Sequence, residues 1–167
     1  MKKTLCLLLT ALSVSLLLPA QNILNENGFE LSLETRSERL IVTIKAPTIG
    51  WIAFATGATD KMKDANIIIV WVDDMMGIAM GEDHFGTSPL SHKNDMELGG
   101  SQDLQVLSGK QTGEYTLVSF SLPLNSGDKY DTELVRGKTY PLLLASGKSD
   151  NISEKLSPVY TGKITIP

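Results

Sequence analysis

Short segments in which apolar and polar residues alternate recur along most of this chain, and they set the strongest limit on its fold. In 28–34, Phe29, Leu31 and Leu33 alternate with polar neighbours, and the segment 39–46 repeats the pattern. A period of two residues places the apolar side chains on one face of a half-buried strand. No segment carries a convincing helical repeat. The pattern therefore predicts an all-β protein.

About nine short strands are expected, separated by turn residues. They are 28–34, 39–46, 50–56, 66–73, 77–83, 104–107, 114–122, 139–146 and 160–166. The segment 66–73 is apolar on both faces, which predicts a central strand covered on both sides. Many short strands of this kind predict a single two-sheet β-sandwich. The segment 85–102 is long for a hairpin loop, and long loops in compact domains tend to be functional.

Residues 1–20 have the organisation of a secretory signal peptide. Lys2 and Lys3 precede an apolar run over 5–18, and a small residue, Ala20, suits cleavage before Gln21. The run is short for a membrane span, although an uncleaved anchor is the alternative. We therefore expect residues 21–167 to form one exported domain, periplasmic or secreted, with no membrane span after cleavage. The single cysteine is in the leader, so disulfides are not expected to stabilise the domain.

Side chains with distinctive chemistry are concentrated in the segment 50–103. Both tryptophans, both histidines and every methionine except Met1 lie there: Trp51, Met62, Trp71, Met75, Met76, Met80, His84, His92 and Met96. Sulfur, imidazole and indole groups gathered in one part of a chain indicate a binding site, because core residues would be spread more evenly.

Composition and motifs exclude some classes of function. The formal net charge is −4, and no basic patch interleaved with aromatic residues is present, so a nucleic-acid partner is not expected. No nucleophile, base and orienting group stand in a recognisable arrangement, so we expect no enzyme. The sequence therefore favours a protein that binds a small-molecule ligand without catalysing a reaction on it.

An ordered series of motifs resembles the DOMON domain over 28–166. The series begins with GWIAFATG and Met62, continues with NIIIVWVDD and HxxDxxLGGxxDL, and ends with 116–124, GDKYD and LLASG. The resemblance implies an immunoglobulin-like sandwich related to the N-terminal domain of dopamine β-monooxygenase and the cytochrome domain of cellobiose dehydrogenase. It also implies a b-type haem or a sugar-like ligand, bound by a binding or electron-transfer module.

In haem-binding members of that family, a methionine at the position of Met62 is one axial ligand of the iron. A thioether ligand raises the reduction potential, which suits electron transfer. The same members carry a histidine near the final strand, but this chain has Lys155 and Leu156 there. A lysine amine binds iron only when deprotonated, and its reference pKa is about 10.4. We therefore expect Met62 on one side of a haem, with the other side open or filled from outside the usual pattern. Alternatively, Met62 fills a gap in the core.

Four other residues are candidates for the pocket. Trp51 and Trp71 are expected either in the core or as a wall on which a porphyrin or sugar stacks. His92 is expected either as a ligand facing the pocket or as a loop residue bonded to Asp95 or backbone. Met96 is expected near the pocket mouth, and His84 in a solvent-facing or structural role.

Two metal sites are weaker alternatives. Met75, Met76, Met80 and His84 offer the soft donors that Cu(I) prefers, although turn and core packing explain these methionines as well. Oxygen ligands for Ca²⁺ could come from Asp73, Asp74, Glu82, Asp83, Asp95 and Asp103, although Asp residues at strand ends more often cap backbone groups.

The favoured function is a non-enzymatic module that binds haem b or a sugar. The first alternative is an electron-transfer cytochrome that serves a redox partner in the periplasm or membrane. The second alternative is an interaction domain that has lost its ligand.

Overall fold

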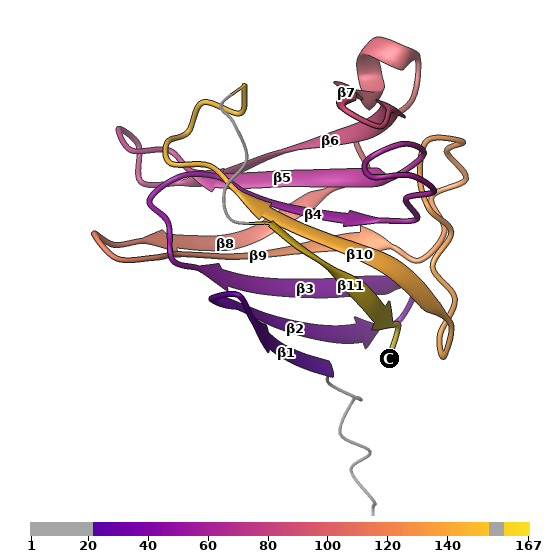
Figure 1. Ribbon diagram of the computed structural model, residues 1–167, viewed down its shortest axis with the longest axis horizontal. Coiled ribbons are helices and arrows are strands. Elements are labelled where there is room, and N and C mark those ends of the chain that lie inside the picture. Colours follow the sequence, from indigo (N-terminus) through magenta and orange to yellow (C-terminus); the bar gives the residue numbers. More distant parts are fainter. Residues whose placement is uncertain (1–21, 154–158) are drawn as a thin grey trace, which may run out of the picture.

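The alternating segments form two antiparallel β-sheets that pack face to face, as the computed structural model shows for residues 22–153 and 159–167 (Figure 1). The first sheet has the order β1 (Asn22–Glu26), β2 (Phe29–Arg36), β3 (Arg39–Ala46), β9 (Thr116–Pro123), β8 (Gln105–Gln111). The second has the order β11 (Val159–Thr165), β10 (Thr139–Ser146), β4 (Ile52–Thr56), β5 (Asn66–Val72), β6 (Ala79–Ser88), β7 (Ser91–Asn94). The predicted all-β sandwich is confirmed. The expected signal peptide and Lys155 and Leu156 lie outside the described residues.

Register in the first sheet follows directly from the alternation. Arg36 pairs with Arg39 across a two-residue turn, so Leu31 lies opposite Ile44 and Leu33 lies opposite Val42. A slip of one residue would turn every apolar side chain of a strand to solvent. The correct register therefore places one continuous apolar face of β2 and β3 in the sandwich core.

The second sheet is apolar on both faces. In β5, Ile68 and Val70 belong to the core between the sheets, whereas Ile67 and Ile69 belong to a second apolar cluster on the outer face. We call this second set the outer cluster; its buried members are Trp51, Ala53, Ala55, Ala65, Ile67, Ile69 and Ala145. Because alternate residues of a strand face opposite sides, the run NIIIVWV requires cover on both faces. The predicted doubly covered central strand is confirmed.

Four elements described here, β6, β7, β1 and a 3₁₀ helix, differ from the sequence expectations. β6 continues to Ser88, five residues beyond the expected end, and then pairs with β7, which had been expected as loop. A 3₁₀ helix, η1 (Asp95–Leu98), follows, with Asn94 accepting a hydrogen bond from the backbone N–H of Met96. β1 was also not expected. β7 reads SHKN, which lacks apolar alternation and pairs through its backbone, so no periodic signal marks it.

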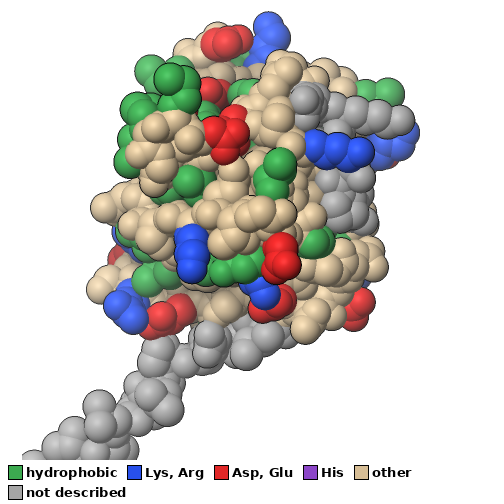
Figure 2. Space-filling view, turned by 90° about the vertical axis from the view of Figure 1, so that its left-hand side faces the viewer, with side chains coloured by type: hydrophobic (Ala, Val, Ile, Leu, Met, Phe, Trp, Pro, Cys, Tyr) green, Lys and Arg blue, Asp and Glu red, His purple; other side chains and the backbone are tan. Residues whose placement is uncertain are grey.

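Surface features place few limits on partners. No helix in the described ranges is long and apolar enough to cross a membrane. Figure 2 shows one end of the molecule, where acidic and basic side chains are interspersed and form no broad patch of one charge. Met75 and Met76 lie exposed in the β5–β6 turn, so the expected core packing of these two side chains is wrong.

Candidate functional site

A pocket lies over the outer cluster. Its outer part has a volume of about 650 Å³ and is lined by Met62, His84, Leu90, Ser91, His92, Lys93, Asn94, Glu97, Ile152 and Ser153. Ligand pockets in proteins commonly have volumes of about 300–1,000 Å³. A small inner recess of about 20 Å³ reaches the apolar floor at Trp51, Ala53, Ile67, Ile69, Leu143 and Ala145. Met62, His92 and Ile152 line both parts, so they mark the junction between the polar rim and the apolar floor.

Met62 is held in place by close backbone contact between its loop and β6. Asp64 donates its backbone N–H to Gly86 O at 2.8 Å, and Gly86 donates its own to Ala65 O at 2.9 Å. A Cβ at Gly86 would lie 1.6 Å from Met62 O, so only glycine permits this approach. Lys61 has a left-handed φ of 53°, which is uncommon for a residue other than glycine. The half-buried Met62 side chain packs on the outer cluster and not in the sandwich core.

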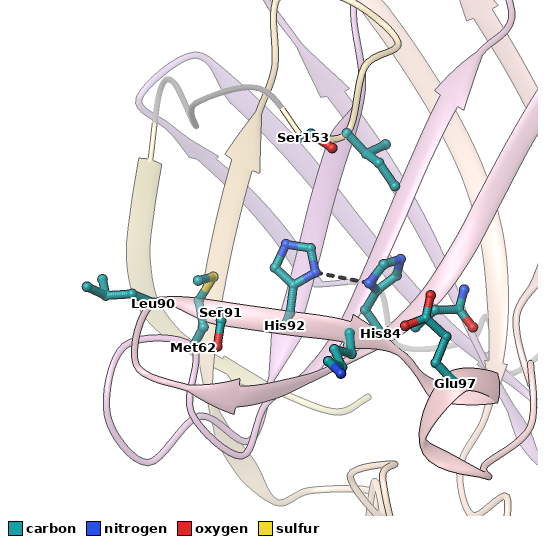
Figure 3. Close-up of a pocket in the computed structure, with 10 residues that line it drawn as sticks. Met62, His84, Leu90, Ser91, His92, Glu97 and Ser153 are labelled. Carbon is teal, nitrogen blue, oxygen red and sulfur yellow. Dashed lines mark hydrogen bonds between the residues drawn. The ribbon is translucent and has the colours of Figure 1, made fainter.

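His84 and His92 form a hydrogen-bonded pair at the β6–β7 hairpin. Their Nδ1 atoms are 3.0 Å apart, and their rings meet edge to face. His84 Nε2 lies 2.8 Å from Glu82 Oε2, which also accepts a hydrogen bond from Asn94 Nδ2. Figure 3 shows His92 between Met62 and His84. Neither sequence alternative for His92, a ligand that faces the pocket or a loop residue bonded to Asp95 or backbone, includes His84 as its partner, because the sequence predicts a loop where β7 forms.

The chain of contacts determines where the protons lie when both imidazoles are neutral. The Glu82 carboxylate only accepts, so His84 Nε2 carries a proton and His84 Nδ1 is bare. His92 Nδ1 must then donate to His84 Nδ1, which leaves His92 Nε2 with a free lone pair. Burial lowers the pKa of His92, and the neighbouring His84 lowers it further, so His92 stays neutral at neutral pH. A neutral imidazole with one bare nitrogen is able to bind a metal.

The two tryptophans occupy different environments. Trp51 is 1% exposed, belongs to the outer cluster, and donates its indole N–H to Asn151 O at 3.1 Å. It therefore forms part of the pocket floor, as does Ile69 beside it. Trp71 is partly buried and packs against the outer cluster without lining either part of the pocket among the described residues.

Met96 and the copper candidates lie elsewhere. Met96 is 64% exposed on η1 and is not among the described residues that line the pocket. Met75 and Met76 lie in the exposed β5–β6 turn, whereas His84 is buried and bonded to His92. Met80 is four residues from His84 on the same strand, about 13 Å away. The four copper candidates are therefore not brought together.

Sequence reasoning did not foresee the Glu82–His84 contact beside the pocket, or much of the pocket lining, including Leu90 and Ile152. Glu82 and His84 are two residues apart, so they share a face of any strand that contains both. This spacing would have indicated the contact if the strand that was predicted to end at Asp83 had included His84. Leu90 and Ile152 lie in turns whose paths no periodic pattern describes.

Comparison with known proteins agrees with this architecture. Residues 25–147 match the family model of the DOMON domain, so the chain belongs to the DOMON family. It is 26% identical over 134 residues to MOXD1 homolog 1 of Drosophila melanogaster. That match covers 79% of this chain but only 17% of the fly protein, so the chain spans a small part of this relative.

Two solved structures share the fold. The cytochrome b domain of pyranose dehydrogenase from Coprinopsis cinerea superposes with a TM-score of 0.61, covering 88% of this chain and 81% of that chain. The cytochrome domain of Myriococcum thermophilum cellobiose dehydrogenase gives a TM-score of 0.60, covering 88% and 82%. Both are 12% identical to this chain, so the likeness concerns the fold. The sandwich thus has the same fold as these two cytochrome domains.

Proposed function

We propose that this domain binds a b-type haem in the pocket over the outer cluster, with Met62 and His92 as the two iron ligands. The observation that carries the proposal is that both side chains line the same pocket, and that His92 Nε2 is left bare by the contact with His84. His92 would then take the role of the histidine that this chain lacks near its final strand.

The residues present fit a haem in their chemistry. A thioether and an imidazole are the axial pair of many electron-transfer haems. Trp51, Ile67, Ile69 and Ala145 supply an apolar floor. The His92–His84–Glu82 chain provides the hydrogen bonding that orients a metal-ligating imidazole and raises its basicity. When bound, haem would supply one-electron redox chemistry; Met62 and His92 would hold it, and the apolar floor would exclude water.

Other ligands are less well supported. A sugar would need several polar groups placed to accept and donate hydrogen bonds, and an exposed aromatic face. The rim offers polar groups, but the floor is apolar, and Trp51 is 1% exposed with its indole N–H bonded to Asn151 O, so it presents no open aromatic face. These features favour a flat, apolar group over a sugar.

The test is an absorption spectrum of residues 21–167 produced in a haem-replete host, recorded before and after dithionite. We expect a Soret band, and sharp α and β bands on reduction, because a Met and His pair makes the iron low-spin. Met62→Ala and His92→Ala should each remove the sharp reduced bands. Met75→Ala is the matched control and should keep them, because Met75 is 96% exposed in the distant β5–β6 turn.

Three results would contradict this assignment in different ways. No Soret band after addition of haem would exclude the haem reading and favour an interaction domain. A Soret band that His92→Ala leaves unchanged would exclude His92 as a ligand. A Soret band without sharp reduced bands in the unmodified protein would indicate an open site that carries haem.

Electron transfer is the role we infer for the bound group. The pocket opens to solvent beside the exposed Leu90, so a redox partner can approach it. We also propose export to the periplasm or cell exterior, because residues 1–20 have the organisation of a secretory signal peptide, and the partner would be a protein there or in the membrane. Measurement of the reduction potential tests this role, because Met62→His should lower it if the thioether sets the potential.

A further inference from the structure

Three aspartates meet at one edge of the sandwich, on the opposite side of β6 from His84. Asp83 comes from β6, Asp95 from η1, and Asp131 from the loop before β10. One carboxylate oxygen of each lies within 4.8 Å of the others. Because Asp83 and His84 are adjacent in a strand, their side chains face opposite sides of the sheet. The aspartate cluster is therefore separate from the proposed haem pocket.

Two of these carboxylates, those of Asp83 and Asp95, are buried without the partners that buried charges require. Asp95 is 0% exposed, and neither of its oxygens has a hydrogen-bond partner. Asp83 is 1% exposed; its Oδ2 accepts one bond from the Asp103 backbone N–H, and its Oδ1 accepts none. Within the described ranges, none of the salt bridges includes Asp83, Asp95 or Asp131. Buried charges are normally paired or bound to a metal.

A neutral side chain points to the same place independently. Asn66, at the start of β5, is 7% exposed, and its Nδ2 donates to Asp131 Oδ1. Its amide group therefore faces the cluster, yet its Oδ1 has no partner. A buried amide oxygen costs free energy when it is left unbonded. Rotation of the amide by half a turn would direct this oxygen towards the three carboxylates.

Mutual repulsion and burial weaken the ionised form of each acid. Burial raises the pKa of Asp83 to about 8, and Asp131 and Asp95 add to the shift. Burial and Asp131 raise the pKa of Asp95 to about 7, and burial raises the pKa of Asp131 to about 6. Two states relieve this repulsion: shared protons or a bound cation. A bound cation would also coordinate the unbonded Asn66 oxygen once the amide is turned, so one ion would both relieve the repulsion and give this oxygen a partner.

We propose that Asn66, Asp83, Asp95 and Asp131 bind a calcium ion. All the donors are oxygens, which suits a hard cation and disfavours copper or zinc. Ca²⁺ takes six to eight oxygens in flexible geometry, so carboxylates that bind through both oxygens, backbone carbonyls and water would complete the shell. The ion would neutralise most of the charge of the three carboxylates.

The surrounding contacts are suited to hold such a site. Tyr130, beside Asp131, donates its hydroxyl to Leu98 O at 2.7 Å, and its ring packs on Phe85 at 5.2 Å between centroids. Asp128 Oδ2 accepts a hydrogen bond from the backbone N–H of Ser101 at 2.6 Å. This bond joins the loop that carries Asp131 to the segment that follows η1. The cation would therefore join β5, β6, η1 and the loop that carries Asp131, and its role is structural.

Calcium-dependent stability is the first test. Protein depleted of metal with EDTA should melt about 5–10 °C below protein with Ca²⁺ at about 100-fold above its dissociation constant. Titration calorimetry should show one Ca²⁺ bound per chain, with much weaker binding of Mg²⁺, which demands a tighter octahedral shell. Equal melting temperatures with and without Ca²⁺, and no heat of binding, would overturn the proposal.

The Asp95→Asn variant distinguishes a bound cation from shared protons. In Ca²⁺ its melting temperature should change in opposite directions under these two explanations. With a cation, the variant should melt below the unmodified protein in Ca²⁺ but at or above it in EDTA, because the substitution removes a ligand and also a repelling charge. Without a cation, the variant should melt at or above the unmodified protein in both buffers. Asp60→Asn, at an exposed aspartate, is the matched control and should change neither melting temperature. A haem spectrum that persists in EDTA would separate this site from the proposed pocket.

Discussion

Glu82, Asp83 and His84 are consecutive residues of β6 that serve two separate environments. Glu82 and His84 share the outer face and reach His92, whereas Asp83 lies on the inner face with Asp95. The period of two along a strand is enough to keep an imidazole pair and an acidic cluster apart by the thickness of one sheet. Single substitutions can therefore affect one site and leave the other intact.

At this scale, Glu82→Ala should weaken haem binding about 10–100-fold, the usual effect of removing the partner that orients a metal ligand. Without Glu82, His84 is free to carry its proton on Nδ1, and His92 Nε2 is no longer kept bare. Haem titration followed at the Soret band measures this change. Glu97→Ala is the control, because Glu97 also lines the pocket but is exposed and does not contact His84. Equal affinity for both variants would show that the Glu82–His84 contact does not tune His92.

At the scale of elements, the Met62 loop and β6 act as one unit. Hydrogen bonds join Asp64 to Gly86 and Gly86 to Ala65, and the absence of a side chain at Gly86 allows Met62 O to approach. The hairpin of β6 and β7 then brings His92 to the same pocket. β6 therefore positions both proposed ligands. It holds Met62 through the loop bonded to Gly86, and His92 through its pairing with β7.

Gly86→Ala should lower the free energy of unfolding by about 1–3 kcal/mol, as expected when an extra methyl group is forced into a packed site. It should also weaken haem binding, because the loop that carries Met62 must move. Urea denaturation and haem titration measure the two effects. Gly113→Ala is the control, since a Cβ there meets nothing within 4 Å. A stable Gly86→Ala variant with unchanged haem affinity would mean that the loop adapts without moving Met62.

At the scale of the whole molecule, the sandwich depends on contacts between the two sheets. Phe54 of β4 and Phe120 of β9 meet edge to face, with ring centroids 5.9 Å apart, in the core between the sheets. The outer cluster, by contrast, lies on the outer face of the second sheet, where Ala58, Met62 and Ile152 pack against it. Stability of the fold and shape of the pocket thus depend on different sets of apolar residues.

A double-mutant cycle checks this separation. Phe54→Leu and Phe120→Leu should show a coupling free energy of about 0.5–1.5 kcal/mol, typical of a paired aromatic contact. Phe120→Leu combined with Ile67→Val, whose side chain lies in the outer cluster, should be additive within about 0.5 kcal/mol. Urea denaturation of the single and double variants supplies the values. Strong coupling of the second pair would show that the two apolar layers are not independent.

Much of the fold was predictable because strand alternation is a local property. Phe29, Leu31 and Leu33 predicted β2, and the fully apolar NIIIVWV predicted a strand covered on both faces; the structure confirms both. The DOMON resemblance, read from an ordered series of motifs, is confirmed by the family match. Met62 and Trp51 both line the inner recess of the pocket, and their role in ligand binding stays a prediction.

The amino-acid sequence alone determined the all-β class and the family, because these depend on residue type and spacing along the chain. Only the tertiary structure decided that His92 meets His84, and that Asp83, Asp95, Asp131 and Asn66 converge. Those contacts depend on the register of β6 with β7 and on the paths of two loops. Polar residues such as SHKN carry no periodic pattern, so backbone pairing and packing, and not local preference, set where they lie.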